Sequence, residues 1–257
     1  MHHKLQNLFD LRGKQALVTG GNSGLGLAMA HCLGIAGARI ILLARREANL
    51  KSAALQLEQD SIGVNFINWD LSSPLQAKQA APEIQNRFGD VDILINAAGT
   101  NLRKKFIEID PEHWEAEISL HLAAPFFLTQ GLAPRMKEKG WGRIINIASM
   151  QSFRAFPNSA PYGSGKGGVL QLTRAIAEEW SRHGITCNAI APGLFRTPLT
   201  EVMFQNPELI KNFEKQTCMG RTGILDDLYG LTLFLSSDAS SFLTGQTIAL
   251  DGGYTAK

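Results

Sequence analysis

A glycine-rich turn between a short strand and a helix constrains the fold of this chain more than any other feature. Residues 14–19 form an apolar run typical of a buried strand, and residues 27–36 have a helical pattern. The turn between them reads Thr-Gly-Gly-Asn-Ser-Gly-Leu-Gly. Glycines allow close backbone approach, and a helix start offers unpaired N–H groups to a phosphate. This order indicates a dinucleotide-binding α/β fold, with an ordinary βα turn as the alternative.

Apolar strands and helical patterns alternate along the rest of the chain, which is typical of a parallel sheet with helices on both faces. We expect the later strands at residues 39–44, 64–68, 91–95, 143–148, 186–191 and 245–253, with helices at 47–61, 73–88, 113–139, up to 183, and 226–236. The 257 residues are 44% hydrophobic and show no linker or repeat. The sequence therefore predicts one domain over residues 1–257, a doubly wound, Rossmann-type α/β fold with a seven-stranded parallel sheet.

Composition excludes several classes of protein. The net charge of +2 gives no electrostatic case for binding nucleic acid or an anionic membrane. No apolar run reaches the roughly 20 residues that span a bilayer, and the first residues lack the apolar segment of a secretion signal. The three cysteines are widely spaced and form no metal-binding motif. We expect a cytoplasmic protein with reduced thiols and no metal.

The end of the second predicted strand indicates which dinucleotide binds. NAD enzymes place a carboxylate there for the ribose 2′-hydroxyl, whereas NADP enzymes place an arginine near the 2′-phosphate. This chain has Ala44-Arg45-Arg46, so no carboxylate stands at the tip. Arg45 can bind a phosphate through two hydrogen bonds. The sequence favours NADP over NAD, and the alternative is that both arginines simply begin a solvated helix.

A tyrosine and a lysine four residues apart form the candidate catalytic pair. Tyr162 and Lys166 share one face if their segment is helical. A free tyrosine has a pKa near ~10, and a cation one turn away lowers that pKa, which suits acid–base work near neutral pH. Ser149 follows a predicted buried strand and is placed to hold a substrate oxygen beside the phenol. The alternative is an ordinary solvated helix face.

Together these motifs resemble the short-chain dehydrogenase/reductase family, in its classical form, over residues 8–254. The resemblance rests on the Gly-x-x-x-Gly-x-Gly turn, the Ser149 to Tyr162 spacing, the Pro-Gly-x-x-x-Thr segment at 192–197 and Asn-Ala-Ala-Gly at 96–99. It implies hydride transfer between a nicotinamide cofactor and a secondary alcohol or ketone. Ser149, Tyr162 and Lys166 would be catalytic.

The resemblance also implies a set of cofactor-binding residues: Gly20, Asn22, Ser23, Gly24, Leu25, Gly26, Arg45, Arg46, Asp70, Leu71, Asn96, Ala97, Ala98, Gly99, Tyr162, Lys166, Pro192, Gly193, Phe195 and Thr197. Asp70 would bond the adenine amino group, or else cap the helix that begins near residue 73. Residues 192–197 would hold the nicotinamide carboxamide, or else form a simple proline–glycine turn.

One catalytic position departs from the family pattern. His121 stands where the family has an asparagine that holds a water and relays protons to the lysine. An imidazole can both donate and accept a hydrogen bond, so we assign His121 to this relay. The alternative is a structural, hydrogen-bonded histidine.

The segment at 103–106, which begins with three basic residues, and the segment at 147–152 resemble gluconate 5-dehydrogenase and 2-deoxygluconate 3-dehydrogenase-like members. They imply a sugar-acid substrate held by Arg103, Gln151 and Phe156, with a lid at about 195–220. Either segment is otherwise plain surface. Two alternatives remain: a 3-oxoacyl thioester reductase with the same core motifs, and a cofactor-binding sensor with little turnover. The resemblance further implies a homotetramer that pairs through the helices of His113 and Tyr162.

Overall fold

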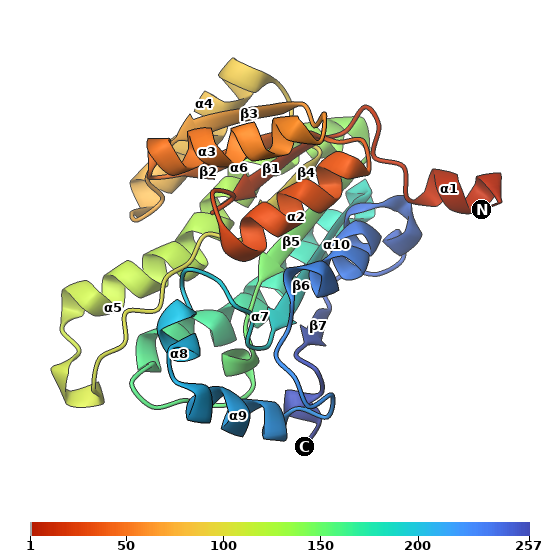
Figure 1. Cartoon of the computed structure of the whole chain (residues 1–257). Coiled ribbons are helices and arrows are strands. Elements are labelled where there is room, and N and C mark those ends of the chain that lie inside the picture. Colours follow the sequence, from red (N-terminus) through yellow and green to blue (C-terminus); the bar gives the residue numbers. More distant parts are fainter. Residues whose placement is uncertain (1) are drawn as a thin grey trace.

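The computed structural model describes residues 2–257, which form a single seven-stranded sheet covered by helices on both faces (Figure 1). The strand order is β3-β2-β1-β4-β5-β6-β7, and every neighbouring pair is parallel. The strands are β1 (Gln15–Thr19), β2 (Arg39–Ala44), β3 (Val64–Asn68), β4 (Ile93–Asn96), β5 (Gly142–Ile147), β6 (Ile185–Pro192) and β7 (Thr247–Leu250). The predicted doubly wound α/β fold is confirmed.

Alternate residues of each central strand face opposite cores, as the pleat of a strand requires. On β1, Leu17 belongs to one buried cluster, whereas Ala16 and Val18 belong to the other. All three are fully buried, so the strand appears in the sequence as a continuous apolar run rather than an alternating one.

The helices divide between the two faces of the sheet. One core packs α4 (Pro74–Phe88), α6 (Ala124–Lys139) and α7 (Ala160–Trp180) against the strands. The other packs α2 (Gly24–Ile35), α3 (Glu47–Gln59) and α10 (Tyr229–Ser236). Because the chain crosses from one face to the other after β3, the strand order reverses between β1 and β4, which is where α/β sheets bind ligands.

The long helix expected at 113–139 is interrupted, and that prediction was wrong in this respect. The structure has α5 (Pro111–Ile118), a π-helical turn at Ser119–Ala123, and then α6. A π turn inserts one extra residue into a helix and often marks a functional site. His121 lies in this turn.

Two features lie at the margins of the fold. Helix α1 (His3–Leu8) was not predicted; it buries no residue and extends away from the sheet in Figure 1. Between β6 and α10 the chain forms α8 (Glu201–Phe204) and α9 (Pro207–Gln216), which lie below the carboxyl ends of the strands in Figure 1. Within residues 2–257, no helix has the length and apolarity needed to cross a bilayer.

Candidate active site

A crevice of about 470 Å³ opens at the carboxyl ends of the central strands. The glycine turn, the tip of β2, the π turn, the segment after β5, α7 and the loop after β6 all contribute to its walls. Ser149, Tyr162, Lys166 and His121 line this one crevice together with the glycine-rich turn. All four candidate catalytic residues are therefore brought together, although 45 residues of sequence separate His121 from Lys166.

The glycines of the turn are required by close backbone packing. Gly20 has φ of +65°, and a Cβ there would lie 2.8 Å from Ala98 Cα. A Cβ at Gly26 would lie 2.5 Å from the Gly20 carbonyl oxygen. Ser23 precedes α2 without capping it by its side chain, so the first N–H groups of the helix remain available to an anion.

Arg45 and Arg46 are exposed at the end of β2 and line both the crevice and an adjoining cavity of about 140 Å³. Asp70 and Leu71 line this adjoining cavity, as an adenine pocket would require. The helix-cap alternative for Asp70 is wrong, because Ser73 caps α4 by accepting from Gln76 N.

The end of β4 is held by side chains from neighbouring strands. Thr19 Oγ1 accepts from the backbone N–H groups of Ala97 and Ala98. Asn96 is buried and donates to Asn146 Oδ1 at 2.8 Å. Ala97 and Gly99 line the crevice, whereas Asn96 lies behind it and joins the tops of β4 and β5.

The loop after β6 borders two cavities. Pro192, Gly193, Phe195 and Thr197 line the crevice as expected. Thr200 orders this loop, since its Oγ1 donates to the Phe195 carbonyl at 2.5 Å and accepts from Thr197 N at 3.0 Å.

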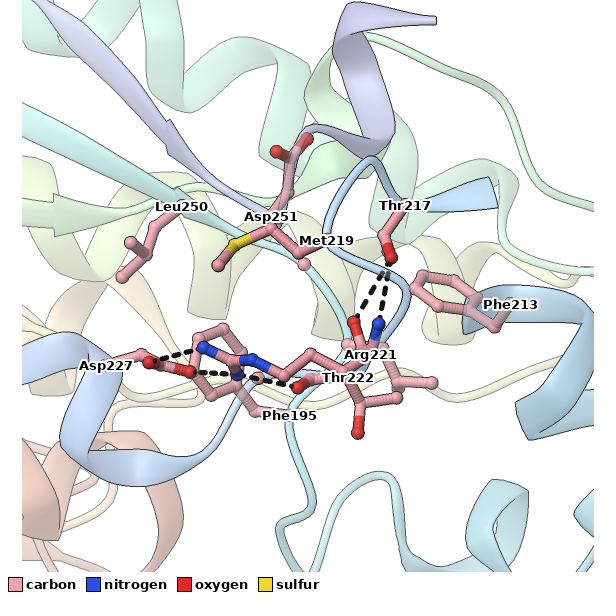
Figure 2. Close-up of a pocket in the computed structure, with 13 residues that line it drawn as sticks. Phe195, Phe213, Thr217, Met219, Arg221, Thr222, Asp227, Leu250 and Asp251 are labelled. Carbon is pink, nitrogen blue, oxygen red and sulfur yellow. Dashed lines mark hydrogen bonds and ion pairs between the residues drawn. The ribbon is translucent and has the colours of Figure 1, made fainter. Parts of the chain in front are cut away.

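Gly193 and Phe195 also line a separate cavity of about 140 Å³ (Figure 2). Its polar groups bond mainly to one another: Arg221 pairs with Asp227 through two contacts of 2.6 and 2.9 Å. The Asp251 carboxylate is directed away from this space and accepts from Gly253 N and Thr255. The crevice is therefore the better candidate for catalysis.

Ser149 begins the 3₁₀ turn at Met150–Ser152, directly after β5. Its Oγ accepts from Gln151 N at 3.1 Å, so its own proton remains free to donate. Ser152 Oγ donates to the Lys166 carbonyl at 2.6 Å and thereby ties this turn to α7. The turn fixes the serine relative to the tyrosine helix.

Tyr162 and Lys166 lie one helical turn apart on α7, with Nζ 5.8 Å from the centre of the phenol ring. Lys166 Nζ donates to the Ile147 carbonyl at 2.6 Å, and burial lowers its pKa to about 8. Burial raises the pKa of Tyr162, while the nearby Ser149 hydroxyl and Arg103 counteract part of that effect. The expected lowering of the tyrosine pKa was therefore wrong for the structure as described, because burial outweighs the charges around the phenol.

His121 is fully buried, and its environment was not foreseen. Nε2 lies 2.9 Å from both the Thr100 carbonyl oxygen and Glu117 Oε2. The ring meets Tyr162 edge-on, with centroids 5.1 Å apart. Burial and the Lys166 charge lower the pKa of His121, and Glu117 opposes them.

Two of the three candidate substrate residues share a cavity. Arg103 and Phe156 line a space of about 210 Å³, together with Met203, Leu209, Asn212 and Phe213 from α8 and α9. Phe213 and Phe156 stack on Tyr254, at centroid distances of 4.7 and 6.1 Å. Gln151 does not line this cavity.

Sequence reasoning missed Glu117, Thr200 and Trp69, the last of which lines the cavity that adjoins the crevice. Glu117 lies four residues before His121, a spacing that brings two side chains together on a helix, and this was the available signal. Thr200 and Trp69 carried no such signal. Among residues 2–257, no cluster of three or more His, Cys, Asp or Glu side chains is arranged to hold a metal.

Full-length relatives match this chain in both sequence and structure. The family model described as enoyl-(acyl carrier protein) reductase matches residues 20–255. Gluconate 5-dehydrogenase of Gluconobacter oxydans is 38% identical, and the match covers 97% of each chain.

Two solved structures superpose along the whole chain. A gluconate 5-dehydrogenase from Burkholderia cenocepacia, in complex with NADP and tartrate, is 36% identical with a TM-score of 0.93, covering 98% of this chain and 99% of that one. A 3-oxoacyl (acyl-carrier-protein) reductase from Agrobacterium tumefaciens with NADP bound is 28% identical, also with a TM-score of 0.93, covering 99% and 100%. Identity and coverage at this level establish common descent: the chain belongs to the short-chain dehydrogenase/reductase family.

Proposed function

We propose that the protein transfers a hydride between NADP and a secondary alcohol or ketone of the sugar-acid type. The observation that carries this proposal is the meeting of Ser149, Tyr162 and Lys166 on the wall of one glycine-lined crevice. Arg103 lines a separate cavity, and its positive charge acts to lower the pKa of Tyr162. A substrate carboxylate at Arg103 and a hydroxyl at Tyr162 would satisfy both groups.

The residues of the crevice fit a nicotinamide dinucleotide that carries a 2′-phosphate. Gly20 and Gly26 allow the backbone to approach a pyrophosphate at the start of α2. Arg45 and Arg46 are exposed beside the adenine pocket, where they suit a phosphate dianion. The Burkholderia relative contains NADP, which supports the same preference here. Bound in this position, the cofactor would supply or accept the hydride.

The protein groups would handle the proton and the geometry. Ser149 would donate its free proton to the substrate oxygen. Tyr162 would take the alcohol proton during oxidation, or give its proton to the carbonyl oxygen during reduction. Lys166, fixed by the Ile147 carbonyl, would stabilise the phenolate that this exchange requires. His121 would stand in place of the family's asparagine in the proton relay.

A lid over the substrate is part of the proposal. Helices α8 and α9 carry the side chains that close the Arg103 cavity from one side. They pack on the body of the protein through the small aromatic and aliphatic cluster around Phe213 and Tyr254, and Lys257 Nζ donates to the Lys215 carbonyl at the end of α9. A segment attached through such a small cluster can open without disturbing the two large cores.

A homotetramer in the cytoplasm completes the proposal. Trp114 on α5 and Phe126 on α6 are each 44% exposed, which supports pairing through these helices. Cys32 and Cys187 are buried free thiols, as expected in a reducing compartment. Light scattering after size-exclusion chromatography measures the assembly; a monomer at micromolar concentration would contradict the tetramer.

A turnover panel tests the proposed activity. Gluconate-like acids and acetoacetyl thioesters are offered with NADP or NADPH, and the reduced-nicotinamide absorbance is followed. We expect turnover of a sugar acid and a raised KM for that acid in Arg103→Ala. Activity on the thioester alone would favour the 3-oxoacyl reductase, which the 28% identical structure represents. NADP binding without any turnover would favour the sensor.

A further inference from the structure

The buried pair of Glu117 and His121 carries an inference about proton transfer that goes beyond the family's asparagine. Glu117 belongs to α5 and His121 to the π turn that follows it. His121 Nε2 faces two acceptors, the Thr100 carbonyl oxygen and the Glu117 carboxylate, each at 2.9 Å. A nitrogen between two acceptors must carry the ring proton. In the neutral ring, Nδ1 is therefore an unprotonated acceptor.

His121 Nδ1 is buried and has no hydrogen-bond partner in the part of the chain that the structure describes, residues 2–257. It lies near the lysine: a methyl-sized group placed on Gly99 would be 3.6 Å from Nδ1 and 3.9 Å from Lys166 Nζ. Both nitrogens thus border the same small volume on the crevice wall. A buried acceptor without a partner costs free energy unless something else uses it. The lysine ammonium, which borders the same volume, is a donor with protons to give.

Glu117 also requires an explanation, because a buried carboxylate is costly. Its side chain is 1% exposed, and its Oε1 accepts from Leu102 N at 2.5 Å. Its other oxygen faces a histidine whose pKa is lowered, so the partner is uncharged at neutral pH. The carboxylate is thus held beside a ring that becomes a matched counter-ion only after it takes up a proton.

The packing fixes the ring in this position. A Cβ at Gly165 would lie 3.0 Å from His121 Cβ, and one at Gly99 would lie 3.1 Å from Cε1. The edge of the ring meets Tyr162 on the remaining side. On the α7 side, Gly165 and Gly168 leave room for the π turn, because a Cβ at Gly165 would meet His121 and one at Gly168 would meet Leu122.

We propose that Glu117 is a positioning residue that makes His121 a one-proton store for Lys166 and Tyr162. The inference deepens the proposed dehydrogenase function and rests on it. Before oxidation, Tyr162 must lose its phenolic proton. The Lys166 ammonium gives a proton to His121 Nδ1, directly or through one water molecule, and the amine so formed takes the phenolic proton of Tyr162. No other bond forms or breaks, and no electrons move in this step.

The charges balance after the transfer. Tyr162 becomes a phenolate beside the Lys166 ammonium, and His121 becomes an imidazolium beside the Glu117 carboxylate. These are the titratable groups that face His121, from α5 and from α7. The phenolate then takes the alcohol proton as the hydride leaves, and the store empties to solvent when the crevice opens.

A double-mutant cycle tests the proposal in the full-length protein. The variants are Glu117→Gln, His121→Phe and their combination, with the exposed Glu115→Gln on the same helix as the matched control. Each store variant should lose about 10²-fold in kcat for oxidation near pH 7. The loss should shrink as the pH rises, because the phenol then ionises without a store. KM and the NADP dissociation constant should not change.

The combined variant decides between the store and a structural role. If Glu117 acts only through His121, the double variant loses no more than His121→Phe alone. Losses that multiply, or a loss that is the same at every pH, would overturn the proposal. Tyr162→Phe distinguishes failure of this proposal from failure of the proposed dehydrogenase function. If the protein is a dehydrogenase that uses Tyr162, this variant is inactive whether or not His121 stores a proton.

A measurement without turnover covers the case of an unidentified substrate. The imidazole ¹⁵N resonances of His121, assigned by their loss in His121→Phe, should show a proton on Nε2 and none on Nδ1. In Glu117→Gln the pKa of His121 should fall, since the carboxylate opposes burial. A proton on Nδ1 at neutral pH, or an unchanged pKa in Glu117→Gln, would contradict the store even if the enzyme is active.

Discussion

The two ends of the crevice are built by different physical means. At the nucleotide end, glycines and backbone N–H groups define the surface, and the charged groups, Arg45 and Arg46, stand in solvent. At the catalytic end, Glu117, His121 and Lys166 are all buried and contact one another or nearby backbone. One end is specified by shape, and the other by charges that the protein keeps away from water.

This difference predicts how each end responds to change. A surface made by backbone tolerates no added atoms, whereas an exposed arginine contributes through one modest charged contact. Buried titratable groups are costly for folding and respond strongly to pH. The catalytic end should therefore trade stability for activity, and the nucleotide end should not.

The largest effect should come from Tyr162→Phe, which removes the proton carrier while keeping the ring that packs on His121. We expect kcat to fall by about 10²- to 10⁴-fold, with the NADP dissociation constant nearly unchanged. Steady-state kinetics and fluorescence titration of the cofactor measure the two quantities. If the variant retained most of its activity, Tyr162 would not be the proton carrier of the catalytic end.

The next effect concerns stability and comes from Lys166→Met. Below pH 8 the lysine is charged in both states, so the native state bears the full cost of burying it. Between pH 8 and 10.5 only the unfolded state binds the proton, and wild-type stability therefore rises with pH. The quantity of interest is the free energy of unfolding of Lys166→Met minus that of wild type. This difference should be about 3 kcal/mol larger near pH 7 than near pH 10.5.

Urea unfolding across this range measures that difference. The raised pKa of Tyr162 acts in the opposite direction above pH 10, and it cancels because both proteins contain the tyrosine. A stability difference that does not vary with pH would show that burying the charged lysine does not lower the stability of the native state.

At the nucleotide end, Gly26→Ala should destabilise the protein by about 1–3 kcal/mol and weaken NADP binding, because the new Cβ would meet the Gly20 carbonyl at 2.5 Å. Gly167→Ala is the matched control: it is also helical, with nothing within 4 Å, and should gain up to about 1 kcal/mol. Thermal melts with and without NADP measure both. Equal changes in melting temperature and in NADP binding for the two variants would contradict the conclusion that close backbone packing specifies the nucleotide end.

The smallest effect should be that of Arg45→Ala on cofactor choice. We expect the dissociation constant for NADP to rise about tenfold and that for NAD to stay the same. The effect on NADP is modest because an exposed charged contact contributes only about 1–2 kcal/mol to binding. Isothermal titration with both cofactors measures the two constants. Equal wild-type affinities for NAD and NADP would contradict the role of the arginine.

Much of the fold was predictable because its strands are buried on both faces and appear as unbroken apolar runs. The strands expected at 39–44 and 64–68 match β2 and β3 residue for residue. The π turn was not predictable in this way, since one inserted residue leaves the apolar pattern of a long helix nearly unchanged. The structure itself was needed to find it.

The site shows the same limit. Motif spacing predicted that Ser149, Tyr162 and Lys166 act together, and all three line the same crevice. Spacing, however, carries no information about burial. For that reason the direction of the Tyr162 pKa was wrong, and Glu117 was overlooked: a glutamate in a polar helical stretch is ordinarily solvated. The charge balance of a buried cluster depends on residues that no single motif contains.

The stack of Phe156, Tyr254 and Phe213 gives the chain an optical reporter. Its members come from the loop before α7, the segment after β7 and α9, so they stay parallel only while those three parts are docked. Tyr254 is one of only three tyrosines in the sequence. Near-ultraviolet circular dichroism of the Tyr254→Phe and Tyr254→Leu variants would isolate its signal. A change in this signal on adding ligand would show that α9 moves in solution, without any attached dye.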